Sequence, residues 1–556
     1  MIAVPVVPVH GAGPKSPPDT CASMSQPRPP LVFDRTKTAM TLFEALLQAS
    51  KLYGAKKIII EDQDRQPLTY RRLILGSLVL GGKLAAVTQR NEAVGLLLPS
   101  ANGLAVTLFG LNAFGRVPAL LNFTAGLRNM TAAVKTAMIR TIVTSRRFVE
   151  IAKLEDVVAG LSSIEVSPGR RLRVIYLEDV KASIGKIDKA KGIARALYAT
   201  KFHQAHALRP DQAAVILFTS GTEGTPKGVV LSNHNLVSNA QQIHAHASGM
   251  LTPDDIVFNP LPMFHSFGLT AATLMPLLSG MRTVLYPSPL HYKQVPELIA
   301  KTKATVLFAT DTFCQGYVRA AAGDNLATIR YVVAGAERVK EQTRSMWSKN
   351  GAIILEGYGA TECSPVLACN LPDINGPGTV GPLLPGIECR LDPVEGITGG
   401  GRLHVSGPNV MMGYMTADRP GIVVPPENGW HDTGDIVDFD GAKRVVIKGR
   451  AKRFAKLGGE MISLAAVESM IADLWAEHNH VVVAVPDQRK GEQLVLLTEK
   501  PDPSREAIMA AAKAAGVPEL WVPKQILTVD DIPLLGSGKV DFPAALKLAR
   551  RQPADA

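Results

Sequence analysis

The chain has 556 residues, a formal net charge of +11, 46% hydrophobic residues and 20% charged residues. This length is too great for one hydrophobic core, so we expect two or more domains of ordinary globular composition. The five cysteines are scattered, odd in number and without metal-ligand spacing, which argues against a disulfide framework and favours a reducing compartment such as the cytoplasm.

The first 37 residues contain eight prolines and no basic segment before an apolar core. They have the pattern of neither a signal peptide nor a membrane span, and we expect residues 1–37 to be a disordered leader. Elsewhere, apolar runs such as Leu104–Phe109 stop well before the roughly 18 residues that a membrane-spanning helix needs. We therefore expect at most a peripheral contact with a membrane.

In chain order, short apolar strands alternate with helices as far as about residue 380. A helix is predicted over Thr41–Leu52, and the long apolar segment that ends at Leu121 includes another. The predicted strands are Lys57–Glu61, Ala93–Leu98, Arg140–Thr144, Arg173–Leu177, Ile256–Asn259, Thr283–Tyr286, Ala304–Phe308 and Ile329–Ala334. This alternation predicts an α/β fold, in which parallel-rich sheets carry helices on both faces.

After residue 380 glycine and proline become frequent, and short strands at Arg402–Ser406 and Ile436–Phe439 indicate a small β-rich region. Past Arg450 the pattern predicts a compact α+β domain. Its predicted elements are a helix at Leu464–Trp475, strands at His480–Val485 and Gln493–Thr498, and a helix from Ser504.

Basic residues are concentrated before this last domain. From Ala451 to the end, 13 Lys and Arg residues stand against 14 Asp and Glu residues, and the preceding 450 residues carry 47 against 35. Much of the excess comes from Arg146, Arg147, Arg170, Arg171, Arg173 and the segment Lys181–Lys201. Such a surface suits nucleic acid, anionic lipid or an acidic protein, and it is equally the pattern of a solvated face without a partner. No DNA- or RNA-binding motif accompanies it, so we expect no nucleic-acid partner.

The segment Ile216–Val230 reads ILFTSGTEGTPKGVV, in which an apolar strand end leads into a run of small residues and one lysine. Successive N–H groups in such a loop form an anion-binding concavity, and hydroxyls and a lysine add donors for phosphate oxygens. The candidate phosphate-binding residues are Thr219, Ser220, Gly221, Thr222, Glu223, Gly224, Thr225 and Lys227. The spacing is not that of a Walker A loop, and a flexible surface loop is the alternative.

Two further segments have the shape of pocket walls. LPMFHSFG places His265 between aromatic residues and Gly268 shortly after it, although a lone histidine is more often a structural residue. YVVAGAE is a predicted strand that ends in small residues, so Gly335 and Ala336 would admit a flat ring against the backbone.

The segment EGYGATE contains Tyr358, which can stack on a base, and Gly359. It also contains Thr361, which can donate to a phosphate, and Glu362, which offers an oxygen ligand for Mg²⁺. A turn that merely contains a glutamate is the alternative.

The last three segments lie toward the C-terminus. In GWHDTGD, Asp435 follows Thr-Gly at an expected strand start and can accept hydrogen bonds from ribose hydroxyls. In IKGRAKRFAK, Arg450 and Lys452 fall at the boundary in composition, where a hinge is expected. In LLGSGKVD, Lys539 lies in a glycine-rich loop from which it could reach a neighbouring site.

Together these segments resemble the adenylate-forming superfamily of acyl-CoA synthetases, luciferases and peptide-synthetase adenylation domains. TSGTEGTPKG, GYGATE, TGD, GRAKR and GSGK occur in the family's order over nearly the whole chain, from Thr41 to Asp541. The resemblance implies an AMP-binding domain over residues 38–450 and a small C-terminal domain over residues 451–556 that moves between two steps.

A subgroup is indicated by YPSPLHY, RYVVAGAERV, GRAKRFAKLGGEMISL and PLLGSGKVDF. These segments resemble the acyl-[acyl carrier protein] synthetase part of the bifunctional 2-acylglycerophosphoethanolamine acyltransferase/acyl-ACP synthetase. That family also carries an acyltransferase domain with a His-x4-Asp motif. We interpret the one His-x4-Asp here, His206 to Asp211, as coincidence and expect no acyltransferase activity.

The resemblance implies that ATP and Mg²⁺ activate a medium- or long-chain fatty acid as an acyl-adenylate. It assigns Lys539, Thr361 and Glu362 to catalysis, with Glu362 as the metal ligand. Besides the phosphate loop, it assigns ATP contacts to Gly335, Ala336, Tyr358, Gly359, Asp435 and Arg450. His265 and Gly268 would line the acyl pocket, and Lys452 would be the hinge.

The thiol acceptor would be a phosphopantetheine group. We expect it on acyl carrier protein, and the alternative is a long-chain fatty acid–CoA ligase that uses coenzyme A. A non-catalytic acyl- or nucleotide-binding protein is the alternative from another class, against which Lys539, Glu362 and Lys227 together argue. We expect the enzyme in the cytoplasm, with at most a peripheral contact with the inner membrane.

Overall fold

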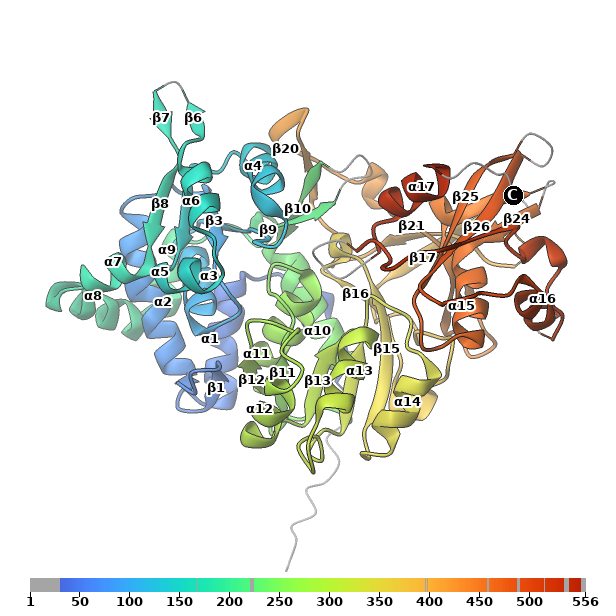
Figure 1. Cartoon of the computed structure of the whole chain (residues 1–556). Coiled ribbons are helices and arrows are strands. Elements are labelled where there is room, and N and C mark those ends of the chain that lie inside the picture. The colour runs from blue at the N-terminus through green and yellow to red at the C-terminus, as the bar shows by residue number, and fades with distance from the viewer. Residues whose placement is uncertain are drawn as a thin grey trace, which may run out of the picture.

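The computed structural model describes residues 31–167, 169–220, 225–395, 397, 399–457, 460–487, 491–514, 516–534 and 540–551. Within these residues, two eight-stranded sheets, a four-stranded sheet and a five-stranded sheet are packed with helices (Figure 1). A small two-stranded sheet of β6 (Glu165–Ser167) and β7 (Arg170–Arg171) stands apart (Figure 1). This architecture confirms the α/β class, with a large N-terminal part and a smaller α+β part at the C-terminus.

The first sheet has the strand order β20-β19-β10-β9-β4-β3-β5-β8. Its strands are β3 (Ala93–Leu97), β4 (Val117–Leu120), β5 (Thr141–Thr144), β8 (Arg173–Tyr176), β9 (Ala213–Ser220), β10 (Pro226–Ser232), β19 (Gly413–Thr416) and β20 (Arg419–Val424). The pairs from β9 to β8 are parallel, and those from β9 to β20 are antiparallel.

Helices cover both faces of this sheet because alternate residues of each strand point to opposite sides. On β9, Val215 and Leu217 belong to the core that contains α2 (Tyr70–Ala85) and α3 (Asn102–Ala113). The intervening Ile216 belongs to the opposite core, with α4 (Gly126–Thr136) and α6 (Glu155–Ser162). The expected burial of both faces is therefore confirmed.

The second sheet has the order β16-β15-β14-β13-β11-β12-β1-β2, with antiparallel pairs only at its two edges. Its strands are β1 (Ile58–Glu61), β2 (Leu68–Thr69), β11 (Ile256–Asn259), β12 (Arg282–Leu285), β13 (Val306–Ala309), β14 (Tyr331–Ala334), β15 (Ile353–Gly359) and β16 (Val366–Cys369). One face packs on α12 (Gln294–Thr302), α13 (Asp311–Ala320) and α14 (Glu341–Ser348). The other packs on α10 (Asn233–His246) and the π-helical segment Phe267–Leu274.

The remaining sheets lie toward the C-terminus. The four-stranded sheet contains β17 (Glu388–Asp392), β18 (Gly401–Ser406), β21 (His431–Phe439) and β22 (Val445–Arg450). The five-stranded sheet contains β23 (Phe454–Leu457), β24 (Glu460–Ser463), β25 (His480–Asp487), β26 (Gly491–Thr498) and β27 (Gln525–Thr528). It packs with α15 (Leu464–Leu474), α16 (Arg505–Ala514) and α17 (Phe542–Arg551).

Other helices connect these layers. They are α1 (Leu42–Tyr53), α5 (Arg146–Ile151), α7 (Leu177–Ala182), α8 (Lys186–Leu197), α9 (Ala199–His206) and α11 (Met275–Leu278). No helix among the described residues combines the length and the apolar character that crossing a membrane requires.

Two local expectations were wrong. The predicted loop Thr219–Gly228 is in part a β-hairpin, because β9 continues to Ser220 and β10 begins at Pro226. Asp435 lies inside β21, which begins at His431, and not at a strand start. The predicted β-rich region after residue 380 is present, but its strand β19 pairs with β10 of the first sheet. Strand pairing over nearly 200 residues of sequence leaves no local signal.

The junction at residue 450 is short. Strand β22 ends at Arg450, the 3₁₀ turn Ala451–Arg453 follows, and β23 begins at Phe454. A domain boundary at this turn, and the movement of the C-terminal domain about it, stay predictions.

Candidate active site

The hairpin β9–β10 carries the predicted phosphate loop. Thr219 pairs with Lys227, and Ser220 pairs with Pro226. Gly221, Thr222, Glu223 and Gly224 lie outside the described residues. The ammonium of Lys227 lies 5.2 Å from the ring centre of Tyr414, which is on the adjacent strand β19. This cation–π contact holds the lysine at the tip of the hairpin.

Tyr414 connects the hairpin to the segment EGYGATE. Its hydroxyl donates a hydrogen bond to Oε1 of Glu362, with an O–O distance of 2.7 Å. Burial raises the pKa of Tyr414, and the neighbouring Glu362 carboxylate acts in the same direction, so the hydroxyl keeps its proton. The backbone oxygen of Glu362 also accepts a hydrogen bond from the Met411 N–H at 2.7 Å. Glu362 is thus positioned through both its side chain and its backbone.

A second contact joins EGYGATE to the segment that contains His265. The Ser266 hydroxyl donates to Oγ1 of Thr361 at 3.2 Å. The half-buried ring of His265 lies 4.7 Å from that of Phe264. Gly268 is required for packing, because a Cβ there would overlap the carbonyl oxygen of Pro262. An acyl-pocket role for His265 and Gly268 stays a prediction.

The third contact group is buried between the second and the four-stranded sheet. The Tyr358 hydroxyl donates to Oδ2 of Asp435 at 2.6 Å, and Nε of Arg450 lies 3.0 Å from Oδ1. Both Tyr358 and Asp435 are buried, whereas the Arg450 side chain is 66% exposed. Burial raises the pKa of the Asp435 carboxyl, and Arg450 and Tyr358 act in the opposite direction. The Asp435 carboxyl therefore has two directed partners, the Tyr358 hydroxyl and the Arg450 guanidinium.

The carboxyl ends of β14 and β15 present small residues side by side. The register pairs Ala334 with Glu356, so that Gly335 and Ala336 continue beyond β14 while β15 runs on to Tyr358 and Gly359. A Cβ on Gly335 would lie 3.2 Å from the Phe267 ring, and one on Gly359 would overlap the Pro365 carbonyl. Ligands of α/β sheets bind at this end of parallel strands.

Ala336 has φ +69°, a left-handed conformation that costs a residue with a Cβ roughly 1–2 kcal/mol. Such backbone strain tends to be retained at functional sites. Its side chain is exposed, beyond the end of the strand.

No contact among the described residues joins Lys452 or Lys539, the two predicted lysines of the C-terminal part, to the groups above. Lys452 is exposed in the turn Ala451–Arg453. Lys539 lies outside the described residues, although Leu534 and Val540 on either side of its loop form an antiparallel bridge. Their predicted roles stay predictions.

Sequence reasoning missed Tyr414 and Ser266, which hold Glu362 and Thr361 through side-chain hydrogen bonds. Neither residue lies in a motif whose chemistry identifies it: Tyr414 is an ordinary strand residue, and Ser266 was noted only as part of LPMFHSFG. Tyr358 was expected to stack on a base, but its hydroxyl has a separate role in fixing Asp435.

Glu362 is the predicted metal ligand. Among the described residues, no group of three or more His, Cys, Asp or Glu side chains could hold a metal ion. Mg²⁺ commonly binds through one or two carboxylates plus substrate phosphates and water. Glu362 therefore fits a Mg²⁺ that arrives with a nucleotide, and it does not fit a preformed metal site.

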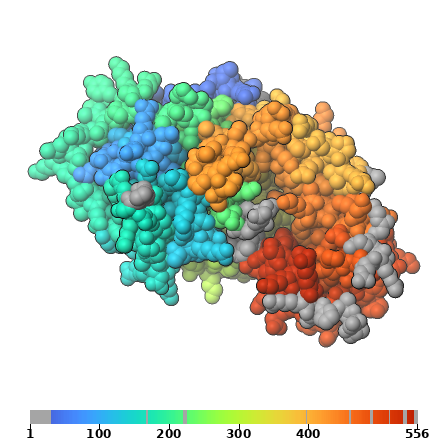
Figure 2. Space-filling view, turned by 90° about the horizontal axis from the view of Figure 1, so that it is seen from above, coloured from blue at the N-terminus to red at the C-terminus, as the bar shows by residue number. Residues whose placement is uncertain are grey.

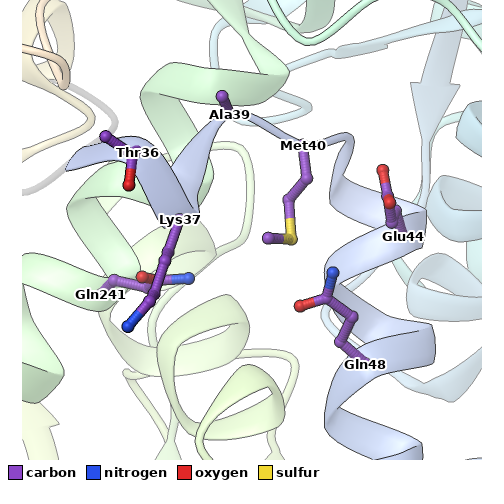
Figure 3. A pocket seen from close by; sticks show the side chains of 7 residues that line it. All are labelled: Thr36, Lys37, Ala39, Met40, Glu44, Gln48 and Gln241. Atoms are coloured by element: carbon purple, nitrogen blue, oxygen red, sulfur yellow. The ribbon is translucent and has the colours of Figure 1, made fainter. Parts of the chain in front are cut away.

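Seen from above, the surface is hollowed beside the orange segment around β20, with green atoms in the hollow (Figure 2). A separate cavity of about 420 Å³ is lined by Thr36, Lys37, Ala39, Met40, Glu44, Gln48 and Gln241 (Figure 3). It lies between the N-terminal segment and α10, and it contains none of the predicted site residues. We therefore do not assign the substrate to it.

Residues 47–415 match the family model of AMP-binding enzymes. The chain belongs to the AMP-binding enzyme family. This match spans the phosphate hairpin, EGYGATE and Tyr414. The predicted family is therefore confirmed, whereas TGD, GRAKR and GSGK lie beyond the matched residues.

Individual relatives extend this result. The medium-chain fatty-acid–CoA ligase of Escherichia coli K12 is 30% identical over 346 residues, which cover 59% of this chain and 60% of the relative. The alignment thus spans less than two thirds of that relative's length. The long-chain fatty-acid–CoA ligase of Salmonella typhimurium is 24% identical over 535 residues, covering 91% of this chain and 94% of that protein.

Among solved structures, o-succinylbenzoate coenzyme A synthetase of Bacillus subtilis, in complex with ATP and magnesium ion, superimposes with a TM-score of 0.72. Its identity to this chain is 20%, and the match covers 89% of this chain and 98% of that chain. This similarity shows that the two chains share their fold.

Proposed function

We propose that this protein is an AMP-forming fatty acid–thiol ligase. The main support is that side-chain contacts join three predicted motifs. Tyr414 connects the phosphate hairpin to Glu362, and Tyr358 connects EGYGATE to Asp435. These contacts support the proposal because they join the segments predicted to bind phosphate, Mg²⁺ and ribose. The fatty-acid ligases among the relatives support fatty acid as the substrate.

In the first step, a carboxylate oxygen of the fatty acid attacks the α-phosphorus of ATP. The bond from that phosphorus to the bridging oxygen breaks, and pyrophosphate leaves. Both reactants are anionic, so the site must neutralise them and hold them in line. Lys227 and the hairpin backbone would hold the outer phosphates, and Mg²⁺ on Glu362 would neutralise charge there. Lys539 would stabilise the charge that develops at the α-phosphate.

Nucleotide positioning would rest on the groups around Asp435. The Asp435 carboxylate would accept hydrogen bonds from the ribose hydroxyls, with Arg450 beside it. The small residues Gly335, Ala336 and Gly359 would leave room for the adenine next to Tyr358. In the second step, a thiol sulfur attacks the acyl carbon of the adenylate, AMP leaves, and the thiol proton is released. Rotation of the C-terminal domain about Lys452 would open the path for the thiol.

The thiol acceptor has two candidates. Coenzyme A is the better supported, because the relatives that cover most of the chain are fatty-acid–CoA ligases. Acyl carrier protein is the second candidate, and the subgroup segments RYVVAGAERV and GRAKRFAKLGGEMISL favour it. Both present the same phosphopantetheine thiol.

A thioester assay with one fatty acid, ATP and Mg²⁺ separates the candidates when coenzyme A and holo-acyl carrier protein are compared at equal thiol concentration. Faster acyl transfer to coenzyme A supports the first candidate, and faster transfer to the carrier protein supports the second. Absence of thioester with either thiol, over fatty acids of medium and long chain length, would contradict the proposed ligase.

A further inference from the structure

Helix α8 (Lys186–Leu197) displays large apolar side chains to solvent. Ile187, Ile193 and Leu197 are 71%, 52% and 75% exposed, and Tyr198, directly after the helix, is 67% exposed. The helix lies at the far left edge of the molecule, with α2 on its inner side (Figure 1). Single exposed apolar residues need no explanation, but a group of them on one helix indicates an interaction surface.

The apolar side chains of Ile187, Ile193 and Leu197 share the outer face of the helix, and the exposed Lys186, Ala190 and Ala194 fall within the same arc. The buried position of α8 is Gly192, where a Cβ would overlap Val79 of α2. An α-helix turns by about 100° per residue. The side chains of Ile187, Ile193 and Leu197 therefore fall within an arc of about 120°, whose centre is about 160° around the helix from Gly192. The strip therefore points away from the protein, and we refer to Ile187, Ile193 and Leu197 as the α8 strip.

Lysines flank the α8 strip on both sides. Between Lys181 and Lys201 the chain has six Lys and Arg residues and one acid, Asp188. Asp188 pairs with Lys83 of α2 at 3.1 Å, and Arg195 points inward to the rings of Phe114 and Phe202. The five exposed basic residues are Lys181, Lys186, Lys189, Lys191 and Lys201.

The surroundings of the helix add to this positive charge. A groove of about 300 Å³ between α2 and α8 is lined by Val79, Gly82, Lys83, Ala86, Asp188, Lys191 and Arg195. Asp188 is the only acid in that lining, and it is already paired with Lys83. A partner of α8 must therefore be apolar at its centre and anionic at its rim.

We propose that the outer face of α8 docks the protein on a bilayer that contains anionic phospholipid. The α8 strip inserts at the level of the headgroups, and the flanking lysines extend toward the lipid phosphates. An acidic carrier protein is disfavoured as the occupant, because a carrier must deliver its thiol near Asp435. In Figure 1, α8 and β21 lie at opposite sides of the molecule. The exclusion of a carrier protein rests on the proposed ligase activity, whereas the vesicle-binding test below does not.

Vesicle flotation of the full chain tests the proposal, with phosphatidylcholine vesicles that either contain or lack phosphatidylglycerol. The triple variant Ile187→Ser/Ile193→Ser/Leu197→Ser should reduce binding to phosphatidylglycerol vesicles at least about tenfold. The matched control is Ile151→Ser/Leu290→Ser/Ile422→Ser, which removes equally exposed apolar side chains elsewhere. This control should bind vesicles as the unchanged protein does. Melting curves establish that all variants are folded.

A charge variant separates the lipid phosphates from the apolar contact. Lys186→Glu/Lys189→Glu should reduce binding to phosphatidylglycerol vesicles and remove its dependence on ionic strength. Binding that is equal in the triple variant and the unchanged protein would overturn the proposal. A second result would also overturn it: the unchanged protein does not bind vesicles but self-associates in sedimentation, and the triple variant abolishes this self-association. The face would then serve a second copy of the chain.

Discussion

Replacing Tyr358 with Phe removes one hydroxyl from the buried contact with Asp435 and leaves the aromatic ring in place. The lost hydrogen bond is 2.6 Å long and runs to the Asp435 carboxyl, a residue that is 4% exposed and is paired with Arg450. Hydrogen bonds to charged groups contribute about 1.5–3 kcal/mol, and the low exposure of both residues leaves little reason to discount that value. We expect Tyr358→Phe to lower the free energy of unfolding of the N-terminal part by about 2 kcal/mol.

The same change should weaken nucleotide binding, because Asp435 would lose the Tyr358 hydroxyl and keep Arg450 of its two described side-chain partners. We expect the KM for ATP to rise by about tenfold, which corresponds to about 1.4 kcal/mol. Since the Tyr358 hydrogen bond lowers the pKa of Asp435, its loss raises that pKa further. The acid limb of the activity profile should therefore move to higher pH.

A double-mutant cycle with Tyr358→Phe and Asp435→Ala measures this coupling, with thermal unfolding and ATP kinetics as readouts. Tyr198→Phe, on an exposed tyrosine, is the control and should change neither. If the free-energy change of the double variant equals the sum of the two single changes to within about 0.5 kcal/mol, the two residues do not act together. This result would refute our explanation of the site.

Glu362→Gln should reduce fatty-acid activation by about 10²–10³-fold and make it insensitive to Mg²⁺ concentration, since Glu362 is the proposed metal ligand; an unchanged Mg²⁺ titration would exclude that role. Lys539→Ala should abolish pyrophosphate exchange yet spare thioester formation from supplied acyl-adenylate. Lys452→Pro should spare pyrophosphate exchange and block thioester formation. Equal loss of both steps in either variant would contradict the two-step assignment. Burial lowers the pKa of His203 from 6.5 to about 4, so between pH 6.5 and pH 4 the unfolded chain binds more protons than the folded chain. The free energy of unfolding therefore falls by about 3 kcal/mol as the pH drops through this range. His203→Gln should flatten this pH dependence of the melting temperature, and a slope equal to that of the unchanged protein would show that His203 is not its source.

Much of the fold followed from local patterns. Ile256–Asn259 was predicted because a buried strand between helices forms a short apolar run. Arg402–Ser406 was predicted to within a residue from its place in a Gly- and Pro-rich segment. The pairing of β19 with β10 was not predictable in this way, because it depends on contacts between residues far apart in sequence. The same limit applies to the hairpin β9–β10, whose small residues have the composition of a loop.

The candidate site shows the same division. Glu362 and Asp435 were predicted from the chemistry of their motifs, and Arg450 from the family resemblance, and their roles stay predictions. Tyr414, which positions Glu362, was missed because only the folded chain brings β19 beside EGYGATE. Tyr358 was found for one property, its ring, while the structure shows the use of another, its hydroxyl.

The most direct test of the central claim is ATP–pyrophosphate exchange with a fatty acid and no thiol present. The proposed ligase predicts exchange that requires both Mg²⁺ and the fatty acid, and that is lost in Lys539→Ala. Exchange that proceeds without a fatty acid, or no exchange with any acid of medium or long chain length, would contradict the claim that this protein activates fatty acids as adenylates.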